Sequence, residues 1–255
     1  MGRTGLLLNA GAVLFAFGLL ATWQVLADFQ IISPVFFPPP TRAVSELVLR
    51  LADGSAYPSI VSTCLRMFFG WICASALGVL LGAIIGSSRF GREYLEPTLE
   101  FVRPLPASAI IPVAILFLGL TNQMSVAVIA FGAIWPVLLS SVYGFGSIQG
   151  RLQEVSAVLG LTRIEFLRKI AIPSAMPDIL SGIRVSLAIS LILAVVTEMQ
   201  TSLPGIGRDI FMAQRSFRSA DLYAGLILLG AIGFIVNYAL LTFEKRALRW
   251  RNPYS

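Results

Sequence analysis

The chain has 255 residues, of which 56% are hydrophobic and only 13% are charged. Soluble domains carry about a quarter charged residues, so this composition excludes an ordinary soluble globular protein and indicates lipid as the main solvent. The net charge of +6 would suit nucleic-acid binding in a soluble protein, but the basic residues lie in short loops between apolar stretches and fit membrane orientation better.

Apolar stretches in chain order predict about six membrane-spanning helices in one transmembrane domain, because a spanning helix needs about 20 apolar residues. The first stretch continues to Ala27, which favours a span over a signal peptide. The uncharged stretch from Pro104 to Gly150 is long enough for two spans, and its prolines predict a distorted entry to the first of them. The predicted spans of this all-α integral membrane protein are residues 5–27, 58–88, 104–120, 123–145, 177–200 and 221–243.

The lysines and arginines predict the orientation of these spans. With the N-terminus inside, twelve of them lie in cytoplasmic segments and five in external ones, while Arg66 and Arg184 fall within spans. Short cytoplasmic loops carry the excess of basic residues in membrane proteins. We therefore expect both termini, and the long loop of about residues 146–176, to face the cytoplasm.

Small residues recur along one face of the second predicted span. Residues four apart lie on the same side of a helix, and small side chains let another backbone approach closely in a membrane. The pattern predicts tight helix packing, with the partner either within the chain or in a second copy. The residues of this stripe are Gly70, Ala74, Gly78, Gly82 and Gly86.

The loop between the fourth and fifth spans has the pattern of two short helices. Val155, Val158 and Leu159 share one apolar face, and Gly160 can adopt a left-handed cap. A second apolar stripe follows, and Pro173 is expected to end it. The apolar faces are covered either by the chain's own membrane helices or by a partner.

The same loop resembles the EAA loop of bacterial ABC importer permeases. The resemblance runs from Glu154 to Gly160 and then, after nine residues, through Ile170-Ala171-Ile172-Pro173, with small or apolar departures at Val155, Ser156 and Ile172. Other segments are similar, in order, to the sulfonate, taurine and nitrate branch of that family. They are Phe36–Pro40, Ser62–Arg66 with Gly70, Arg103–Pro106 with Ile111-Pro112, Trp135-Pro136, Thr197–Met199 and Gly205–Gly207.

The resemblance implies a permease subunit of an ATP-driven importer in the bacterial inner membrane. Such an importer contains two permease copies, here expected as a homodimer, with two ABC ATPase subunits and an external substrate-binding protein. The solute would be a sulfonate, taurine, nitrate or a related small molecule. In that family the loop forms a coupling helix seated on the ATPase, which assigns coupling to Glu154, Ala157, Leu159, Gly160, Ile170 and Pro173.

The chain itself is not expected to be an enzyme. It has only two lysines, neither in a Gly-Lys-Ser/Thr phosphate-binding loop, so ATP and Mg²⁺ would bind to the partner ATPase. It has no histidine, which excludes a Ser-His site and argues against a metal site or an intramembrane enzyme. We expect no cofactor, metal or nucleic acid on this chain, only the protein partners and membrane lipid.

Charged and polar residues in or near the spans are candidates for the translocation path. A charge at mid-bilayer costs about 2.5–3.5 kcal/mol, so such residues usually face protein or a wet path. The candidates are Arg66, Asn122, Trp135 and Glu198, and for the charged ones, which lie near span ends, snorkelling or structural pairing is an equal interpretation. An ion-coupled secondary transporter is the alternative function, and Glu198 is its one strong candidate carboxylate. No residue in the sequence identifies the substrate.

Overall fold

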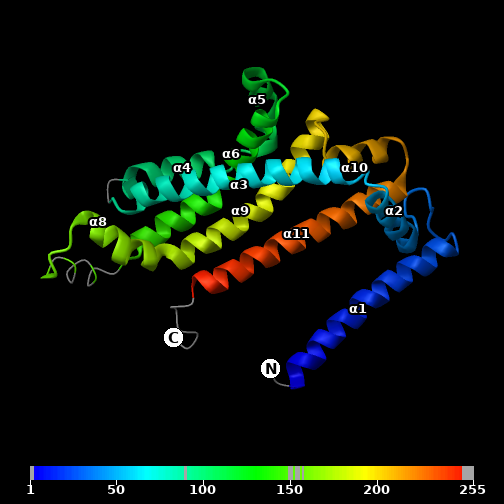
Figure 1. Cartoon of the computed structure of the whole chain (residues 1–255), viewed down its shortest axis with the longest axis horizontal. Helices are drawn as coiled ribbons and strands as arrows, with labels where there is room; N and C mark the ends of the chain where they lie inside the picture. The colour runs from blue at the N-terminus through cyan, green and yellow to red at the C-terminus, as the bar shows by residue number, and fades with distance from the viewer. Residues whose placement is uncertain (1–2, 89–90, 149–151, 153–155, 157, 249–255) are drawn as a thin grey trace.

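The computed structural model describes residues 3–88, 91–148, 152, 156 and 158–248, and every regular element in these ranges is helical. The long helices form an elongated bundle, with α1 running away from it (Figure 1). The helices are α1 (Arg3–Asp28), α2 (Pro40–Ala52), α3 (Tyr57–Gly86), α4 (Glu96–Val102), α5 (Ile111–Leu118), α6 (Asn122–Gly146), α8 (Arg163–Phe166), α9 (Ile172–Thr201), α10 (Ile206–Arg215) and α11 (Ser219–Ala247).

Four helices in the described ranges are long and apolar enough to cross a membrane: α3, α6, α11 and the continuous helix from Ile164 to Thr201 that contains α9. A fifth candidate is the bent pair formed by Glu93–Val102 and Ala107–Leu118. The apolar α1 spans 26 residues. The chain is therefore an all-helical membrane protein, and the count of six spans stays a prediction.

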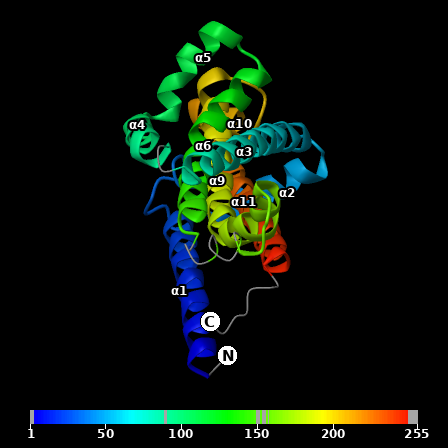
Figure 2. The same cartoon turned by 90° about the vertical axis from the view of Figure 1, so that its left-hand side faces the viewer.

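The third predicted span, residues 104–120, has the distorted entry that its prolines predict, and its helical part is the limb Ala107–Leu118. The chain bends by 78° between the two limbs of the bent pair. Pro104 and Pro106 lie at the bend, where each lacks the N–H that a continuing helix would need. This segment projects from the side of the bundle opposite α11 and α1 (Figures 1 and 2).

The core consists of α3, α6 and α9, which pack on one another along most of their length. The stripe of small residues on α3 is buried and faces α6. A Cβ added at Gly78 would lie 2.8 Å from Cβ of Val137, and one at Gly86 would lie 2.6 Å from the carbonyl oxygen of Val142. The glycines thus let the two backbones approach closely, and the packing partner of the stripe lies within the chain.

Pro173 does not end a helix, contrary to the prediction. It is the second residue of α9, and the continuous helix from Ile164 to Thr201 runs through it. The preceding turn, Leu167–Ala171, is π-helical and joins α8 to α9 without a break. The second half of the predicted helix pair is therefore the beginning of the long helix that ends at Thr201.

The two ends of the bundle differ in structure. At one end, here called the α10 end, the amphipathic helices α2 and α10 pack against the beginning of α11. At the other, the α8 end, residues 158–166 project beyond the core helices (Figure 1). The contacts that the structure describes for helix α1 include those with α2 and the packing of Trp23 on Tyr223, whose ring centroids are 5.2 Å apart.

Candidate functional site

A buried charged pair lies at the α10 end, where three core helices meet. Arg66 projects from α3 and Glu198 from the last turn of α9, and their side chains are 5% and 0% exposed. Arg66 Nη1 lies 2.5 Å from Glu198 Oε1. Two charges buried at this depth are tolerated because each neutralises the other and because both are hydrogen-bonded.

All three guanidinium nitrogens of Arg66 donate hydrogen bonds within the chain. Nε donates to Oδ1 of Asn122 at the beginning of α6, over 2.8 Å, and Nη2 donates to the carbonyl oxygen of Pro204 over 2.5 Å. Together with the bond from Nη1 to Glu198, these hydrogen bonds of the planar guanidinium connect α3 to α6, to α9 and to the loop after α9. Arg66 therefore holds these elements in fixed positions relative to one another.

The carboxylate of Glu198 fastens the loop between α9 and α10. Its Oε2 accepts hydrogen bonds from Thr63 Oγ1 at 3.0 Å and from the backbone N–H of Gly207 at 2.9 Å. Thr63 Oγ1 in turn accepts the N–H of Ile206 at 3.0 Å. Helix α10 thus begins with two of its first N–H groups satisfied by side chains of the core helices.

Two glycines in this loop are required by close approach. A Cβ at Gly205 would overlap the carboxylate of Glu198, and one at Gly207 would lie 3.0 Å from Cβ of Glu198 and closer still to the carbonyl oxygen of Val195. The sequence Gly205-Ile206-Gly207 therefore lets the backbone run directly over the buried carboxylate. The charged pair, Asn122, Thr63 and residues 204–207 are called the buried charge cluster below.

The structure brings three of the four predicted path residues together: Arg66, Asn122 and Glu198. Trp135 lies elsewhere, thirteen residues further along α6, where its ring packs edge-to-face on Phe131 at 5.8 Å. Its indole N–H is buried with no hydrogen-bond partner among the described residues. A role of these residues in the path stays a prediction.

No pattern in the sequence predicts a role for Thr63 or for the two glycines, although their segments contribute to the resemblance. A signal for Thr63 is its position three residues before Arg66, which places both on one face of α3. The backbone acceptor at Pro204 has no signal in the sequence, because any residue supplies a carbonyl oxygen.

A second polar cluster at the α10 end ties α2, α3, α10 and α11 together. Arg50 lies 3.5 Å from Asp209 and 4.0 Å from Asp221, and Ser59 Oγ donates to Asp209 over 2.6 Å. Partial burial and a hydrogen bond with Asp221 raise the pKa of Glu46 above its usual value. These contacts hold the amphipathic helix α2 on the core without any buried unpaired charge.

The loop at the α8 end has two well-defined helix boundaries. Gly160 has φ of +63°, and the N–H of Leu161 donates to the carbonyl oxygen of Ser156 over 3.0 Å, which is the Schellman arrangement. This confirms the predicted left-handed cap. Thr162 and Glu165 then form a capping box, with N–H to side-chain oxygen distances of 3.1 and 3.3 Å. The spacing Thr-x-x-Glu was the signal for it in the sequence.

The residues predicted for coupling are placed only in part. Glu154 and Ala157 lie outside the described residues. Leu159 is 66% exposed, Gly160 is exposed, and Ile170 and Pro173 are partly buried where the chain enters α9. Further apolar exposure comes from Val158, which is 87% exposed, and from Ile164, which is 70% exposed.

Residues 75–249 match the protein family described as binding-protein-dependent transport system inner membrane component. The chain is 29% identical to the putative aliphatic sulfonates transport permease protein SsuC of Bacillus subtilis, over 92% of this chain and 86% of that protein. It is 27% identical to the taurine transport system permease protein TauC of Escherichia coli, over 91% and 86%. It is also 28% identical to the nitrate import permease protein NrtB of Synechocystis, over 89% and 85%.

Solved structures with the same fold include the MetNI methionine ABC transporter in an inward-facing conformation. The TM-score is 0.60 with 19% sequence identity, covering 75% of this chain and 93% of that one. An amino acid ABC transporter gives a TM-score of 0.58 with 17% identity, covering 80% and 98%. These likenesses establish the helical arrangement.

Proposed function

Because this chain belongs to the family of binding-protein-dependent transport system inner membrane components, we propose that it forms the path for a small sulfonate, taurine, nitrate or a similar solute. The chain is the permease subunit of a binding-protein-dependent ABC importer and a multi-pass protein of the inner membrane. The solute is proposed because the relatives named for aliphatic sulfonates, taurine and nitrate each align with about nine-tenths of this chain.

The observation that supports coupling to an ATPase is the exposed apolar edge at the α8 end. Val158, Leu159 and Ile164 are mostly exposed, yet the Schellman cap and the capping box hold the backbone around them in a defined shape. A structured apolar edge that projects beyond the bundle is expected to be covered by a partner. In our proposal this partner is an ABC ATPase subunit, which binds the ATP and Mg²⁺, while the permease chain binds no cofactor.

The route by which a movement of the loop reaches the other end is the helix from Ile164 to Thr201. Its 38 residues correspond to about 55 Å of continuous helix. It begins beside the exposed edge and ends at Glu198 in the buried charge cluster. We infer that closure of the ATPase pair moves this helix as a lever, with the π-helical turn before α9 as its flexible point.

The assembly follows from the same proposal. A second copy of the permease completes the path, two ATPase subunits bind at the α8 end, and an external binding protein docks at the α10 end. The excess of basic residues in the predicted cytoplasmic loops supports an orientation with the α8 end and both termini in the cytoplasm.

The alternative of an ion-coupled transporter receives no support from the geometry. In an ion-coupled transporter, the carboxylate that binds the driving ion has to be open to water first from one side of the membrane and then from the other. Glu198 is fully buried and is held by Arg66, Thr63 and the N–H of Gly207. Its place near the end of α9 also puts it away from the middle of the span.

The coupling role is tested by replacing Gly160 with leucine. An L residue at positive φ costs about 1–2 kcal/mol, and the new side chain would project from the exposed edge, since nothing lies within 4 Å of that position. Gly54→Leu is the matched control, because Gly54 also has positive φ but lies in the connection between α2 and α3. We expect Gly160→Leu to insert normally but to lose ATPase binding and ATP-driven uptake of a radiolabelled sulfonate.

Two results would contradict the proposal. If Gly160→Leu supports uptake at the level of Gly54→Leu, the exposed edge is not the ATPase contact. If the wild-type transporter, supplied with its own binding protein, takes up no sulfonate, taurine or nitrate, the solute assignment is wrong even though the coupling assignment stands.

A further inference from the structure

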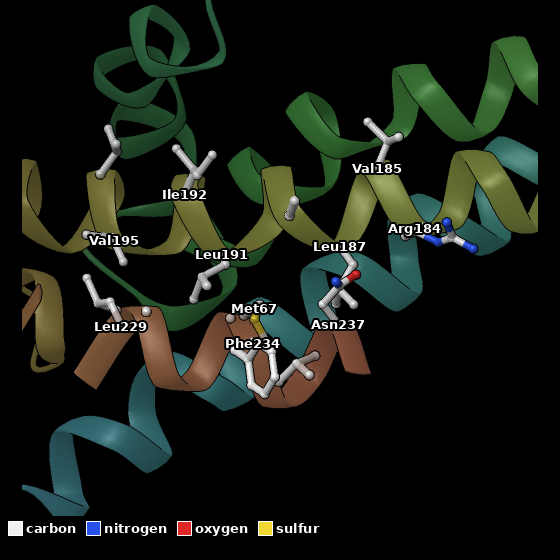
Figure 3. A pocket seen from close by; sticks show the side chains of 15 residues that line it. Met67, Arg184, Val185, Leu187, Leu191, Ile192, Val195, Leu229, Phe234 and Asn237 are labelled. Atoms are coloured by element: carbon white, nitrogen blue, oxygen red, sulfur yellow. The ribbon is translucent and has the colours of Figure 1, made fainter. Parts of the chain in front are cut away.

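A groove of about 830 Å³ lies between α9 and α11, with α3 at its floor (Figure 3). Helix α11 contacts α9 only sparsely and is joined to it mainly through α10, so the two long helices leave space between them. Of the fifteen residues that line the groove, thirteen are apolar or glycine. Its volume is in the range of small-molecule sites, but its wall offers almost no hydrogen bonds.

The two polar lining residues lie toward the same end of the groove. Arg184 of α9 and Asn237 of α11 are near one end, and Val195 and Leu229 are at the other (Figure 3). Arg184 is 38% exposed and forms an ion pair with Glu244. Its Nε is buried with no hydrogen-bond partner in the part of the chain that the structure describes.

The charge balance at this end favours an anion. Lys245 and Arg246 follow Glu244 in the last turn of α11, and both are exposed. The end of α11 that pairs with Arg184 therefore carries two further cations in the same turn as its one carboxylate. A phosphate beside Arg184 would gain charge-assisted hydrogen bonds and the attraction of the two further basic residues.

With the end of α9 at one membrane surface, Arg184 lies at the depth of the lipid headgroups of the opposite surface. Seventeen residues separate it from Thr201 at the α10 end, which is about 26 Å along the helix, close to the ~30 Å hydrocarbon thickness of a bilayer. The apolar wall from Arg184 to Val195 then extends for roughly 17 Å, slightly more than the ~15 Å of one leaflet. A transported hydrophilic solute would lose its water here without replacement.

We propose that this groove binds an acyl chain of an anionic phospholipid, with the phosphate at Arg184. The chain lies along the apolar wall between α9 and α11, and Asn237 offers its amide to the ester groups below the phosphate. The lipid fills the space between α9 and α11 and so contributes to the packing of these two helices.

The test uses the full-length permease extracted from vesicles of equimolar phosphatidylglycerol and phosphatidylcholine with the same acyl chains. Native mass spectrometry counts the lipids that each chain retains. We expect retained phosphatidylglycerol to exceed phosphatidylcholine, and Arg184→Gln to lower this preference about fivefold, the effect of one basic residue near the surface. Glu244→Gln frees the guanidinium and is expected to raise the preference.

A second pair of variants tests the groove itself. Gly230 lines the groove with nothing within 4 Å of an added Cβ, so Gly230→Phe would occupy the site of the acyl chain. Gly18→Phe is the matched control, since Gly18 of α1 is equally open and does not line the groove. We expect Gly230→Phe to lose the retained lipid and Gly18→Phe to keep it.

Three results would overturn the proposal. One is a wild-type permease that retains both lipids equally, and another is a Gly230→Phe variant that retains the wild-type number. The third is a Gly230→Phe variant that loses self-association, measured by light scattering, with its lipid count unchanged, because the groove would then hold a second copy of the chain.

Discussion

Replacing Glu198 with glutamine would remove one charge of the buried charge cluster while keeping its shape. The carboxylate accepts three hydrogen bonds, from Arg66, Thr63 and the N–H of Gly207. If the amide oxygen of the glutamine faces Arg66, its NH₂ group faces the N–H of Gly207, and two donors oppose each other. Leaving a buried donor unsatisfied costs about 1–3 kcal/mol.

The larger part of the loss comes from Arg66. Its side chain is 5% exposed, so the guanidinium would stay buried with only the neutral acceptors Asn122 and the Pro204 carbonyl. Breaking a buried ion pair by removing one partner destabilises by about 3–5 kcal/mol. We therefore expect Glu198→Gln to lower the free energy of unfolding by about that amount, with the loss concentrated at the α10 end.

The assay is a double-mutant cycle with Arg66→Met. The free energy of unfolding of the wild type, both single variants and the double variant is measured by SDS titration in mixed micelles. Hydrogen exchange at the amides of Ile206 and Gly207 reports on the loop directly. We expect faster exchange in Glu198→Gln. We also expect the loss of unfolding free energy in the double variant to be smaller than the sum of the two single losses, by about 2 kcal/mol or more.

Additive losses of unfolding free energy would contradict the pairing of these two residues. If the two single losses simply add in the double variant, Arg66 and Glu198 do not act as a pair. A Glu198→Gln variant within about 0.5 kcal/mol of the wild type would likewise show that the cluster contributes no stability.

Further predictions concern the glycines and the loop cap. Gly205→Ala places a methyl group on the buried Glu198 carboxylate and should cost about 1–3 kcal/mol in the same titration, whereas Gly18→Ala, with open space around it, should cost nothing. Gly78→Leu would separate α3 from α6, and we expect little monodisperse protein by fluorescence-detected size exclusion; a normal elution profile would contradict this. Thr162→Ala removes one half of the capping box, and hydrogen exchange at the amide of Glu165 should become about fivefold faster; unchanged exchange would show that the cap is not formed in solution.

Some features of this protein were predictable from sequence because neighbours along the chain determine them. Long uncharged stretches identify membrane helices since lipid cannot solvate charges, and small residues four apart identify a packing face. The left-handed cap at Gly160 was predictable for the same reason, because a glycine after an apolar helical face commonly ends a helix. The order of motifs along the chain was enough to indicate the family, which the match over residues 75–249 establishes.

Other features depended on how the helices pack. Arg66 lies 56 residues from Asn122 and 132 from Glu198, and no local pattern brings such residues together. The sequence left pairing and a direct role in the path as equal interpretations of these charges. The tertiary structure decided that they are partners, because the close packing of α3, α6 and α9 leaves each charge no other way to be compensated.

Proline illustrates the same division. The sequence indicates where backbone N–H donors are missing, but whether a missing donor interrupts the helix depends on the surrounding structure. At Pro104 and Pro106 the chain bends by 78°, whereas at Pro173 the helix continues through a π-helical turn. Composition and local pattern thus determined that this is a helical membrane protein, and the resemblance of its ordered motifs to a known family indicated a permease. Only the packing of distant segments decided which charges pair, which small residues meet a backbone and which prolines interrupt a helix, because these depend on contacts that the order of residues alone does not define.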